Sequence, residues 1–430
     1  PTLKYMGTQG TSGIKIYEQN IASTGLTENM AKATTSMNIS SAILTDNYRP
    51  EFMPTYEPAT IKIVFDADSR RVIGGQIISK VDLTQFMNTL SVVIQNKMTV
   101  EEFDNIISNF KDKYKVIAPV SIPYAGQYSD TDVIRYEEIK SINEVEFDRK
   151  SHFTAKEVVM PVTETLFYYN EDEYKIPSID EREMLVFMRS CDIHGLHRID
   201  NVYLNNGKEP DYYYKRLRDK VKIVLIGCAE SFRNCFCVSF GTNKTDDYSL
   251  AIKVDKGDVY IDVKDDEFKD IFVGTETDFN IEFVSSNEVK VTLPEELNPL
   301  EVAEAELWRE YDYRCIACGR CNLSCPTCSC YTMQDVVSQD NARCGERRRV
   351  GASCQIPGFS LMAGGHDVRV RNGDRMRYRT MHKMYDYGER FGPQMCIGCG
   401  RCDDVCPQYI SISTAMNKVT QFVKSKQRED

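Results

Sequence analysis

Two copies of one cysteine pattern near the C-terminus constrain this chain more than any other feature. The copies are Cys315-x-x-Cys318-x-x-Cys321-x-x-x-Cys325-Pro326 and Cys396-x-x-Cys399-x-x-Cys402-x-x-x-Cys406-Pro407. Three cysteines at intervals of three residues let a tight loop aim three thiolates at one metal cluster. The fourth, followed by proline, leaves that loop and points away. This spacing is typical of a module that binds two [4Fe–4S] clusters, as in bacterial ferredoxins.

In such modules the fourth cysteine of each run ligates the cluster of the other run. We therefore expect two ligand sets. The first set is Cys315, Cys318, Cys321 and Cys406, and the second set is Cys396, Cys399, Cys402 and Cys325. Zinc and disulfides are the alternatives. Zinc sites usually pair Cys-x-x-Cys units across a longer gap, and disulfides need an oxidising compartment, of which the sequence gives no sign.

The composition is that of a globular chain of two or three domains, with 430 residues, 42% hydrophobic and 27% charged. Its net charge of −11 argues against nucleic acid and against an anionic membrane surface as partners. No apolar run approaches the roughly 20 residues of a membrane span, and the first residues have no signal-peptide pattern. Sixteen cysteines in such a chain are typical of metal ligands in a reducing compartment, so we expect a cytoplasmic location.

The sequence predicts an α+β multidomain fold of three segments. In residues 1–100, strands at 61–66 and 71–79 and a helix at 82–96 predict an α+β layer structure. In residues 101–300, strand-like runs at 184–191 and 221–228, with a helical stretch before the second, predict a central parallel α/β domain. Residues 301–430 are predicted to open with a helix at 294–313 and to form a two-cluster ferredoxin-like domain with an insertion of 70 residues.

Four cysteines precede residue 300, and each of the two predicted parallel strands ends in one of them. The four, which we call the strand-end set, are Cys191, Cys228, Cys235 and Cys237. Sites in parallel α/β domains form beyond the carboxyl ends of the strands. We therefore expect these thiolates to bind a third [4Fe–4S] cluster. The alternative is four ordinary buried cysteines, and a Cys-x-Cys pair is unusual for a cubane.

The insertion holds four more cysteines, which we call the insertion set: Cys328, Cys330, Cys344 and Cys354. They could bind further metal or tune the nearest cluster through packing and S–H contacts. Asp403 and Asp404 follow the third cysteine of the second run. Negative charge disfavours the reduced, more anionic form of a cluster. We therefore expect the cluster of the second run to have the lower potential.

The first segment resembles the C-terminal dimerisation domain of NADH oxidases, which belong to the pyridine nucleotide-disulfide reductase superfamily. The resemblance rests on three stretches: Met6–Gly13, Ile21–Thr27 and Ile73–Lys80. It implies a role for residues 1–100 in self-association. No redox cysteine lies in this segment, so we expect no oxidase activity from it, although a fragment of a fused flavin-dependent NADH oxidase stays open as an alternative.

From about residue 104 onward the chain resembles the iron–sulfur electron-transfer subunit of anaerobic sulfite reductase and is similar to the β electron-transfer subunits of cytoplasmic sulfhydrogenases. The stretches that carry the resemblance are Tyr128–Tyr136, Arg189–His194, Asn234–Cys237, Cys325–Cys330, Gly345–Arg349, Ala363–His366 and Cys399–Pro407. The resemblance implies an iron–sulfur protein without a catalytic site of its own. It would relay electrons from an NADH-linked, FAD-binding subunit to a sirohaem subunit that reduces sulfite. The alternative partner is a soluble NAD(P)-linked hydrogenase.

Overall fold

The structure, a computed structural model, describes residues 11–47, 58–81, 90, 94, 113–126, 130–255, 258–269, 277–278 and 280–428. Its contacts divide the chain into two compact units. The first is Pro1–Lys111 with Ser141–Asn143 and Val254–Val259, and the second is Asp112–Lys140, Glu144–Lys253 and Tyr260–Asp430. The helix expected at 82–96 lies outside the described residues except at the helical positions 90 and 94, and so do residues 6–10 of the first resemblance stretch and 128–129 of the second.

The first unit contains a five-stranded antiparallel sheet in the order β1-β2-β5-β4-β3. Its elements are β1 (Ser12–Ile16), β2 (Gln19–Gly25), α1 (Glu28–Thr34), β3 (Ile39–Asn47), β4 (Pro58–Asp66) and β5 (Val72–Ser79). Thr27 caps α1, because its hydroxyl accepts a hydrogen bond from the Met30 backbone N–H at 3.3 Å. The strands predicted at 61–66 and 71–79 are confirmed as β4 and β5, which form a hairpin.

The second unit is built on a six-stranded sheet in the order β13-β12-β11-β10-β6-β7. Its elements are β6 (Tyr114–Ile122), β7 (Val133–Glu138), β10 (Glu183–Arg189), α4 (Ser190–Tyr203), α5 (Tyr212–Arg218), β11 (Val221–Ile226), β12 (Leu250–Asp255) and β13 (Asp258–Val263). Strands β6, β10, β11 and β12 run parallel, and β7 pairs antiparallel with β6. The predicted parallel strand pair is confirmed, with Met184 opposite Val221 and Arg189 opposite Ile226.

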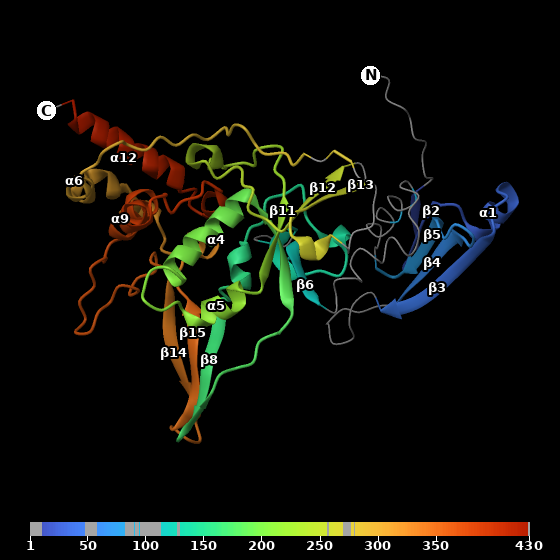
Figure 1. Cartoon of the computed structure of the whole chain (residues 1–430), viewed down its shortest axis with the longest axis horizontal. Coiled ribbons are helices and arrows are strands. Elements are labelled where there is room, and N and C mark those ends of the chain that lie inside the picture. The colour runs from blue at the N-terminus through green and yellow to red at the C-terminus, as the bar shows by residue number, and fades with distance from the viewer. Residues whose placement is uncertain are drawn as a thin grey trace. The chain divides into compact units, whose positions relative to one another are not determined.

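Apolar side chains of β10, α4 and β11 form one buried core. It contains Val186, Met188, Ile193, Leu196, Ile199, Ile223 and Leu225. Such continuous apolar strands are typical of a parallel sheet that is covered on its faces. This packing holds the carboxyl ends of β10 and β11 side by side, and α4 starts directly after β10. Figure 1 shows α4 next to β11.

The C-terminal part consists of short helices around a second core that includes Trp308, Met376 and Met416. The helices are α6 (Pro299–Glu304), α7 (Glu310–Arg314), α8 (Arg320–Leu323), α9 (Asn372–Met381), a π-helix at His382–Asp386, α10 (Tyr387–Phe391), α11 (Arg401–Asp404) and α12 (Ile412–Lys426). The single helix predicted at 294–313 is wrong. Pro299 starts α6, and the extended backbone of Ala305 (ψ 136°) ends it, so α6, a 3₁₀ turn and α7 follow one another.

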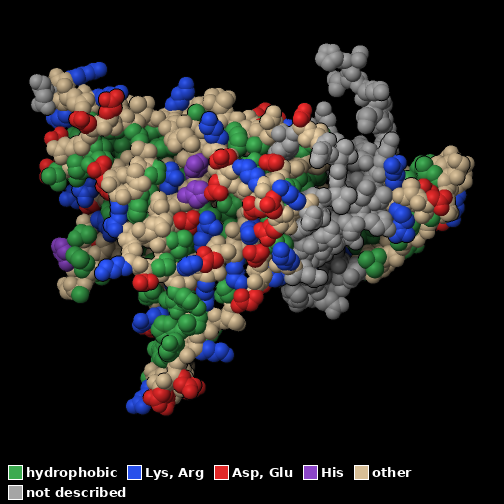
Figure 2. All heavy atoms as spheres, viewed as in Figure 1, with side chains coloured by type: hydrophobic (Ala, Val, Ile, Leu, Met, Phe, Trp, Pro, Cys, Tyr) green, Lys and Arg blue, Asp and Glu red, His purple; other side chains and the backbone are tan. Residues whose placement is uncertain are grey.

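The insertion between the cysteine runs contributes two strands to a projecting four-stranded antiparallel sheet, in the order β14-β15-β8-β9 (Figure 1). The strands are β8 (Thr163–Asn170), β9 (Glu173–Lys175), β14 (Tyr331–Val337) and β15 (Cys344–Gly351). Because β15 pairs with β8, the segments predicted on either side of residue 300 share one sheet and one compact unit. Hydrophobic side chains gather on this sheet (Figure 2), and the exposed ones include Tyr168, Tyr174, Met333 and Val337.

Candidate iron–sulfur sites

The two cysteine runs have the same backbone, as their shared sequence predicts. Two residues of each run have a positive φ of 57–73°: Ala317, Gly319, Gly398 and Gly400. This left-handed geometry turns backbone N–H groups toward the cysteine sulfurs. The Ala317 N–H lies 3.4 Å from Cys315 Sγ, and the Gly398 N–H lies 3.5 Å from Cys396 Sγ. A short helix, α8 or α11, then follows each loop.

The first set comes together as the cross-ligation pattern predicts. Cys406, from the second run, lines one pocket with the three cysteines of the first run, Cys315, Cys318 and Cys321. The backbone N–H of Ile410 also points at Cys406 Sγ from 3.3 Å. Cys318 is exposed, and the other three are half-buried. This set therefore lies at the surface of the second unit.

The second set is buried throughout, with exposed fractions of 7–9% for Cys325, Cys396, Cys399 and Cys402. Burial raises the pKa of the Cys396 thiol to about 12, and the neighbouring charges of Cys325 and Cys399 add to that rise. Burial and the charge of Cys325 likewise raise the pKa of Cys399 and Cys402. Buried thiols of this kind become thiolates when bound iron supplies the positive charge. The donor chemistry of both sets therefore fits iron–sulfur clusters.

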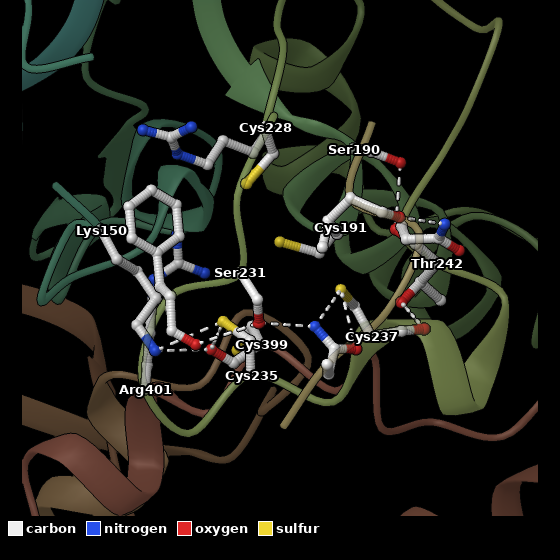
Figure 3. A pocket seen from close by; sticks show the side chains of 15 residues that line it. Lys150, Ser190, Cys191, Cys228, Ser231, Cys235, Cys237, Thr242, Cys399 and Arg401 are labelled. Atoms are coloured by element: carbon white, nitrogen blue, oxygen red, sulfur yellow. Dashed lines mark hydrogen bonds between the residues drawn. The ribbon is translucent and has the colours of Figure 1, made fainter. Parts of the chain in front are cut away.

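All four cysteines of the strand-end set line a single pocket. Cys191 lies in the first turn of α4, directly after β10, and Cys228 lies two residues after β11. Figure 3 shows the sulfurs of Cys191 and Cys228 turned into the pocket opposite Cys237. Cys235 completes the group, and the side-chain amide of Asn287 lies 3.7 Å from Cys237 Sγ. The structure thus brings together cysteines that are up to 46 residues apart in the sequence.

The pocket of the strand-end set adjoins the second run. Cys399 and Arg401 of that run line it as well, and the Cys235 thiol points to the Cys399 carbonyl at 3.4 Å. The loop that carries Cys235 and Cys237 lies directly on the run, because the Phe236 N–H donates to the Gly398 carbonyl at 2.7 Å. The second run therefore borders the strand-end set through Cys399, and its last cysteine, Cys406, lines the pocket of the first set.

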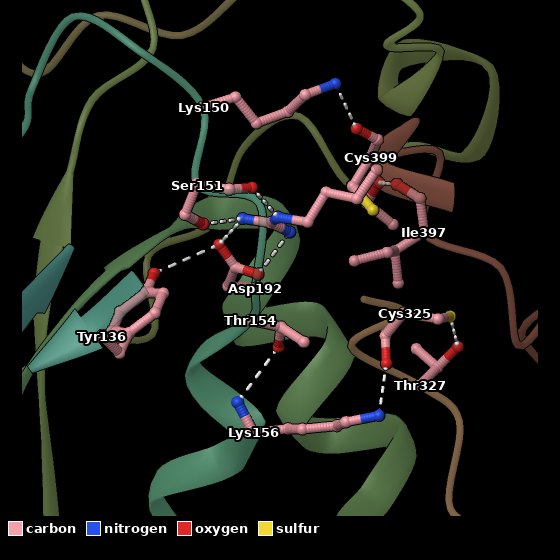
Figure 4. A network of polar contacts seen from close by, with 12 residues as sticks. Tyr136, Lys150, Ser151, Thr154, Lys156, Asp192, Cys325, Thr327, Ile397 and Cys399 are labelled. Carbon is pink, nitrogen blue, oxygen red and sulfur yellow. Dashed lines mark hydrogen bonds and ion pairs between the residues drawn. The ribbon is translucent and has the colours of Figure 1, made fainter. Parts of the chain in front are cut away.

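A buried ion pair connects the second run to helix α4, which follows β10 of the central sheet. Arg401 and Asp192 form two parallel hydrogen bonds of 2.7 and 2.8 Å, and both side chains are 1% exposed. Figure 4 shows Asp192 and Ser151 within this polar network. The guanidinium also donates to the Ser151 carbonyl and hydroxyl at 2.9 and 3.0 Å. This bidentate geometry satisfies the groups that burial deprives of water.

Two lysines reach the cluster loops from the segment before β8. Lys156 Nζ donates to the carbonyls of Cys325 at 2.7 Å and Cys328 at 2.9 Å. Lys150 forms an ion pair of 2.6 Å with Asp404 and donates to the Cys399 carbonyl at 3.0 Å. Lys150 therefore compensates the negative charge of Asp404, which the sequence analysis did not include; the lower potential of the second cluster stays a prediction.

Three cysteines of the insertion set lie together, since Cys354 is in side-chain contact with Cys330 and shares the neighbour Asn322 with the pocket of Cys328 and Cys330. Cys328 and Cys330 line a third pocket, and Cys354 is buried with its sulfur 3.1 Å from Asn322 Nδ2. Cys344 lies apart from them at the start of β15, beside Asn170. Among the described residues, no three His, Cys, Asp or Glu side chains converge on one metal ion as tetrahedral zinc requires. A cubane differs, since each of its four thiolates binds a different iron.

Sequence reasoning missed the cations that lie among the cysteines. Arg379 lines the pocket of the first set, and Lys383 donates to Thr327 Oγ1 beside Cys325. Both side chains are buried. The sequence does contain a signal for them. Arg375, Arg379 and Lys383 recur every four residues, so on a helix these three cations share one face.

Two protein families match this chain. A 4Fe-4S dicluster domain matches residues 314–410, which include all eight cysteines of the first and second sets. The dimerisation domain of pyridine nucleotide-disulphide oxidoreductases matches residues 11–109. The chain is thus a mixed α/β multidomain iron–sulfur protein with a dimerisation-type domain before its cluster domain. No helix in the described part of the chain is long and apolar enough to cross a membrane.

The N-terminal similarity covers only a quarter of each protein that it matches. An NADH oxidase of Enterococcus faecalis is 48% identical over 108 residues, 25% of this chain and 24% of that protein. The structure of a water-forming NADH oxidase from Lactobacillus brevis has 50% identity and a TM-score of 0.23, and the match covers 24% of this chain and 23% of that one.

The remaining three quarters match one relative along nearly its whole length. Sulfhydrogenase 2 subunit beta of Pyrococcus furiosus is 30% identical over 349 residues, which are 76% of this chain and 98% of that protein. This similarity supports the hydrogenase alternative of the sequence analysis better than the sulfite reductase interpretation. The chain therefore belongs to the family of sulfhydrogenase beta subunits.

Proposed function

We propose that this chain is the iron–sulfur electron-transfer subunit of a soluble NAD(P)-linked hydrogenase. It would carry electrons between a FAD-binding subunit that reacts with the nicotinamide and a nickel–iron subunit. The observation that carries the proposal is the succession of three four-cysteine sets within one compact unit. The second run contributes Cys399 to the pocket of the strand-end set and Cys406 to the pocket of the first set, so the three sets would form a continuous path.

Each set would bind one [4Fe–4S] cluster, which accepts and donates one electron at a time. Cys315, Cys318, Cys321 and Cys406 would hold the first cluster. Cys396, Cys399, Cys402 and Cys325 would hold the second, and Cys191, Cys228, Cys235 and Cys237 the third. The protein groups exclude water from the second set, aim backbone N–H groups at the sulfurs and compensate the thiolates with buried cations.

The solvent exposure of the three sets supports an electron-transfer path whose two outer clusters are accessible to partner subunits. Cys318 of the first set is exposed, and Cys191 and Cys228 of the strand-end set are half-buried. The second set is buried. Electrons would therefore enter and leave through the two outer clusters, where partner subunits can approach, and cross the interior through the second.

Iron and sulfide analysis of the anaerobically purified chain tests the cluster number. Three clusters predict about twelve irons and twelve sulfides per chain. Replacing Cys228→Ser should remove about four irons, whereas the matched variant Cys344→Ser should remove none, because Cys344 belongs to none of the three proposed cluster-ligand sets. A wild-type content of about eight irons that Cys228→Ser leaves unchanged would reject the third cluster but not the other two.

Copurification from the native source tests the partners. A hydrogenase component should bring down two other proteins, one that contains nickel and one that contains FAD. Recovery of sirohaem instead of nickel would support the sulfite reductase alternative. FAD bound to this chain alone, together with oxidation of NADH by it, would support the fused NADH oxidase alternative.

We also propose that residues 1–100 mediate self-association, since residues 11–109 match a dimerisation domain. Ile43 and Leu44 of β3 are each 63% exposed, although both are large apolar residues. Ile43→Glu should lower the mass observed by sedimentation velocity, and Lys15→Glu, on β1, serves as the charge control. An unchanged mass in Ile43→Glu would contradict a role for β3 in the contact.

A further inference from the structure

One helix carries two buried cations beside the cysteines of the first and second sets. Helix α9 and the π-helix at His382–Asp386 follow each other without a break, and π-helical turns often mark functional sites. Arg379 is 4% exposed and Lys383 is 2% exposed. No carboxylate in the described part of the chain forms an ion pair with either side chain. Buried charges are normally paired, so these two cations require an anionic partner of another kind.

Arg379 faces the first set with unsatisfied donors. Its side chain lines the same pocket as Cys315, Cys318, Cys321 and Cys406. Its Nε and Nη2 atoms are buried and have no hydrogen-bond partner among the described residues. Leaving two donors of a buried guanidinium unpaired is costly. Such donors are expected to serve an acceptor within the pocket that they line.

The same helix reaches the second set on its other side. Lys383 Nζ donates to Thr327 Oγ1 at 2.8 Å, and that hydroxyl lies 3.4 Å from Cys325 Sγ. The Lys383 carbonyl accepts from the Cys396 N–H at 3.1 Å. Burial lowers the pKa of Arg379, but the neighbouring thiolates of Cys321 and Cys402, one from each set, raise it well above its usual value. Arg379 and Lys383 lie four residues apart on one continuous helix, so the same helix face borders the first set at Arg379 and the second set at Lys383.

We propose that Arg379 lies between the clusters of the first and second sets, donates its free N–H groups to their sulfur atoms and raises the reduction potential of both. The inference rests on the ligand sets of the proposed function. Reduction of either cluster adds one electron, and hence one negative charge, without a proton. A fixed positive charge and N–H donors stabilise the more anionic reduced form. Arg379 would therefore change the reduction potentials of the two clusters without binding their iron.

Redox titrations followed by EPR, on the anaerobic full-length chain, test this inference. Arg379→Gln should lower the equilibrium constant for reduction of the first and second clusters by at least tenfold each, about 59 mV for a one-electron couple. Arg379→Lys keeps the charge and should cause a smaller shift. The control is Arg377→Gln on the same helix, because Arg377 is half-buried and donates to the Ala303 carbonyl. It should shift neither potential.

Iron and sulfide contents separate the possible failures. A wild-type chain without iron would reject the proposed function itself. If Arg379→Gln keeps its full iron but both potentials stay unchanged, or only one shifts, the bridging role is rejected while the function stands. Equal shifts in Arg377→Gln would also reject it. Loss of clusters from both Arg379 variants, but not from the control, would show a role in assembly alone and would overturn the proposal.

Discussion

Arg320 and Arg401 occupy the same place in the two cysteine runs, between a glycine and the third cysteine. Arg320 is exposed, whereas Arg401 is 1% exposed and held by Asp192 in a bidentate pair. The difference arises because Arg401 faces Asp192 of α4, whereas no carboxylate in the described part of the chain forms an ion pair with Arg320. A buried pair of this kind is weak evidence for net stability, but removal of one partner leaves a charge without compensation.

Asp192→Ala is therefore expected to lower the free energy of unfolding by about 3–5 kcal/mol. Arg401 would remain buried with only the oxygens of Ser151 as partners. Arg320→Ala, the matched change in the first run, should stay within about 0.5 kcal/mol of the wild type. Thermal melting of the anaerobic proteins measures the difference. Equal melting temperatures for the two variants would contradict the structural role of the pair.

Lys383 should act on one cluster only. Its charged end lies beside Thr327 and Cys325; burial lowers its pKa, but the charges of Cys325 and Cys328 raise that pKa by more. Lys383→Gln is expected to lower the potential of the second cluster and to leave the first unchanged. Redox titration by EPR distinguishes this from Arg379→Gln, which should move both. A change in the reduction potential of the first cluster in Lys383→Gln would contradict this, because it would show that Lys383 and Arg379 both influence both clusters.

At the scale of elements, close contact between two loops decides where the third site forms. The loop of Cys235 and Cys237 rests on the second run at Gly398 and Gly400. A methyl group on Gly400 would lie 2.2 Å from the Asn234 carbonyl, and one on Gly398 would lie 2.6 Å from the Cys237 backbone nitrogen. Both positions also have positive φ values. The first run tolerates Ala317 at the position equivalent to Gly398, since no such loop covers it.

Gly400→Ala should therefore separate the loop from the second run. The left-handed backbone costs about 1–2 kcal/mol for alanine, and the clash with the Asn234 carbonyl adds to it. We expect loss of about four irons from the third cluster and a lower melting temperature. Gly319→Ala is the matched control, because its φ is +73° but its new methyl group would meet only the side chains of Ser353 and Ile356, at 3.0 Å. Similar iron losses in both variants would argue against this mechanism.

At the scale of the second unit, the three proposed cluster sites differ in how far their cysteines are exposed to solvent. Cys318 of the first set is exposed, whereas every cysteine of the second set is at most 9% exposed. Oxygen and chelators attack the sites that they can reach. The expected behaviour is therefore an ordered loss of clusters from the surface inward.

Controlled exposure to oxygen in the presence of a chelator checks this gradient. The EPR signal of the first cluster should disappear first and that of the second cluster last. The strand-end cluster should lie between them, since Cys191 and Cys228 are half-buried. Loss of the second cluster before the first would contradict the assigned ligand sets, because a buried cubane cannot be the most accessible one.

The sequence by itself determined the local parts of this protein. Regular cysteine spacing predicted the loops of both runs and the approach of Cys406 to the cysteines of the first run, since these depend on a few neighbouring residues and a repeated pattern. Alternation of apolar residues predicted β4, the turn after it predicted β5 as the returning strand, and apolar runs predicted β10 and β11. The helix expected at 294–313 failed because a local break at Ala305 has no strong marker in the sequence.

Only the tertiary structure decided what surrounds those parts. It paired Arg401 with Asp192, neutralised Asp404 with Lys150, and placed Arg379 and Lys383 beside the cysteines. It also joined β15 of the insertion to β8 and gathered the strand-end set against the second run. These relations connect residues that are tens to hundreds of positions apart, so no local pattern encodes them. They arise because charged groups that become buried when the apolar cores pack must lie next to partners that compensate their charge.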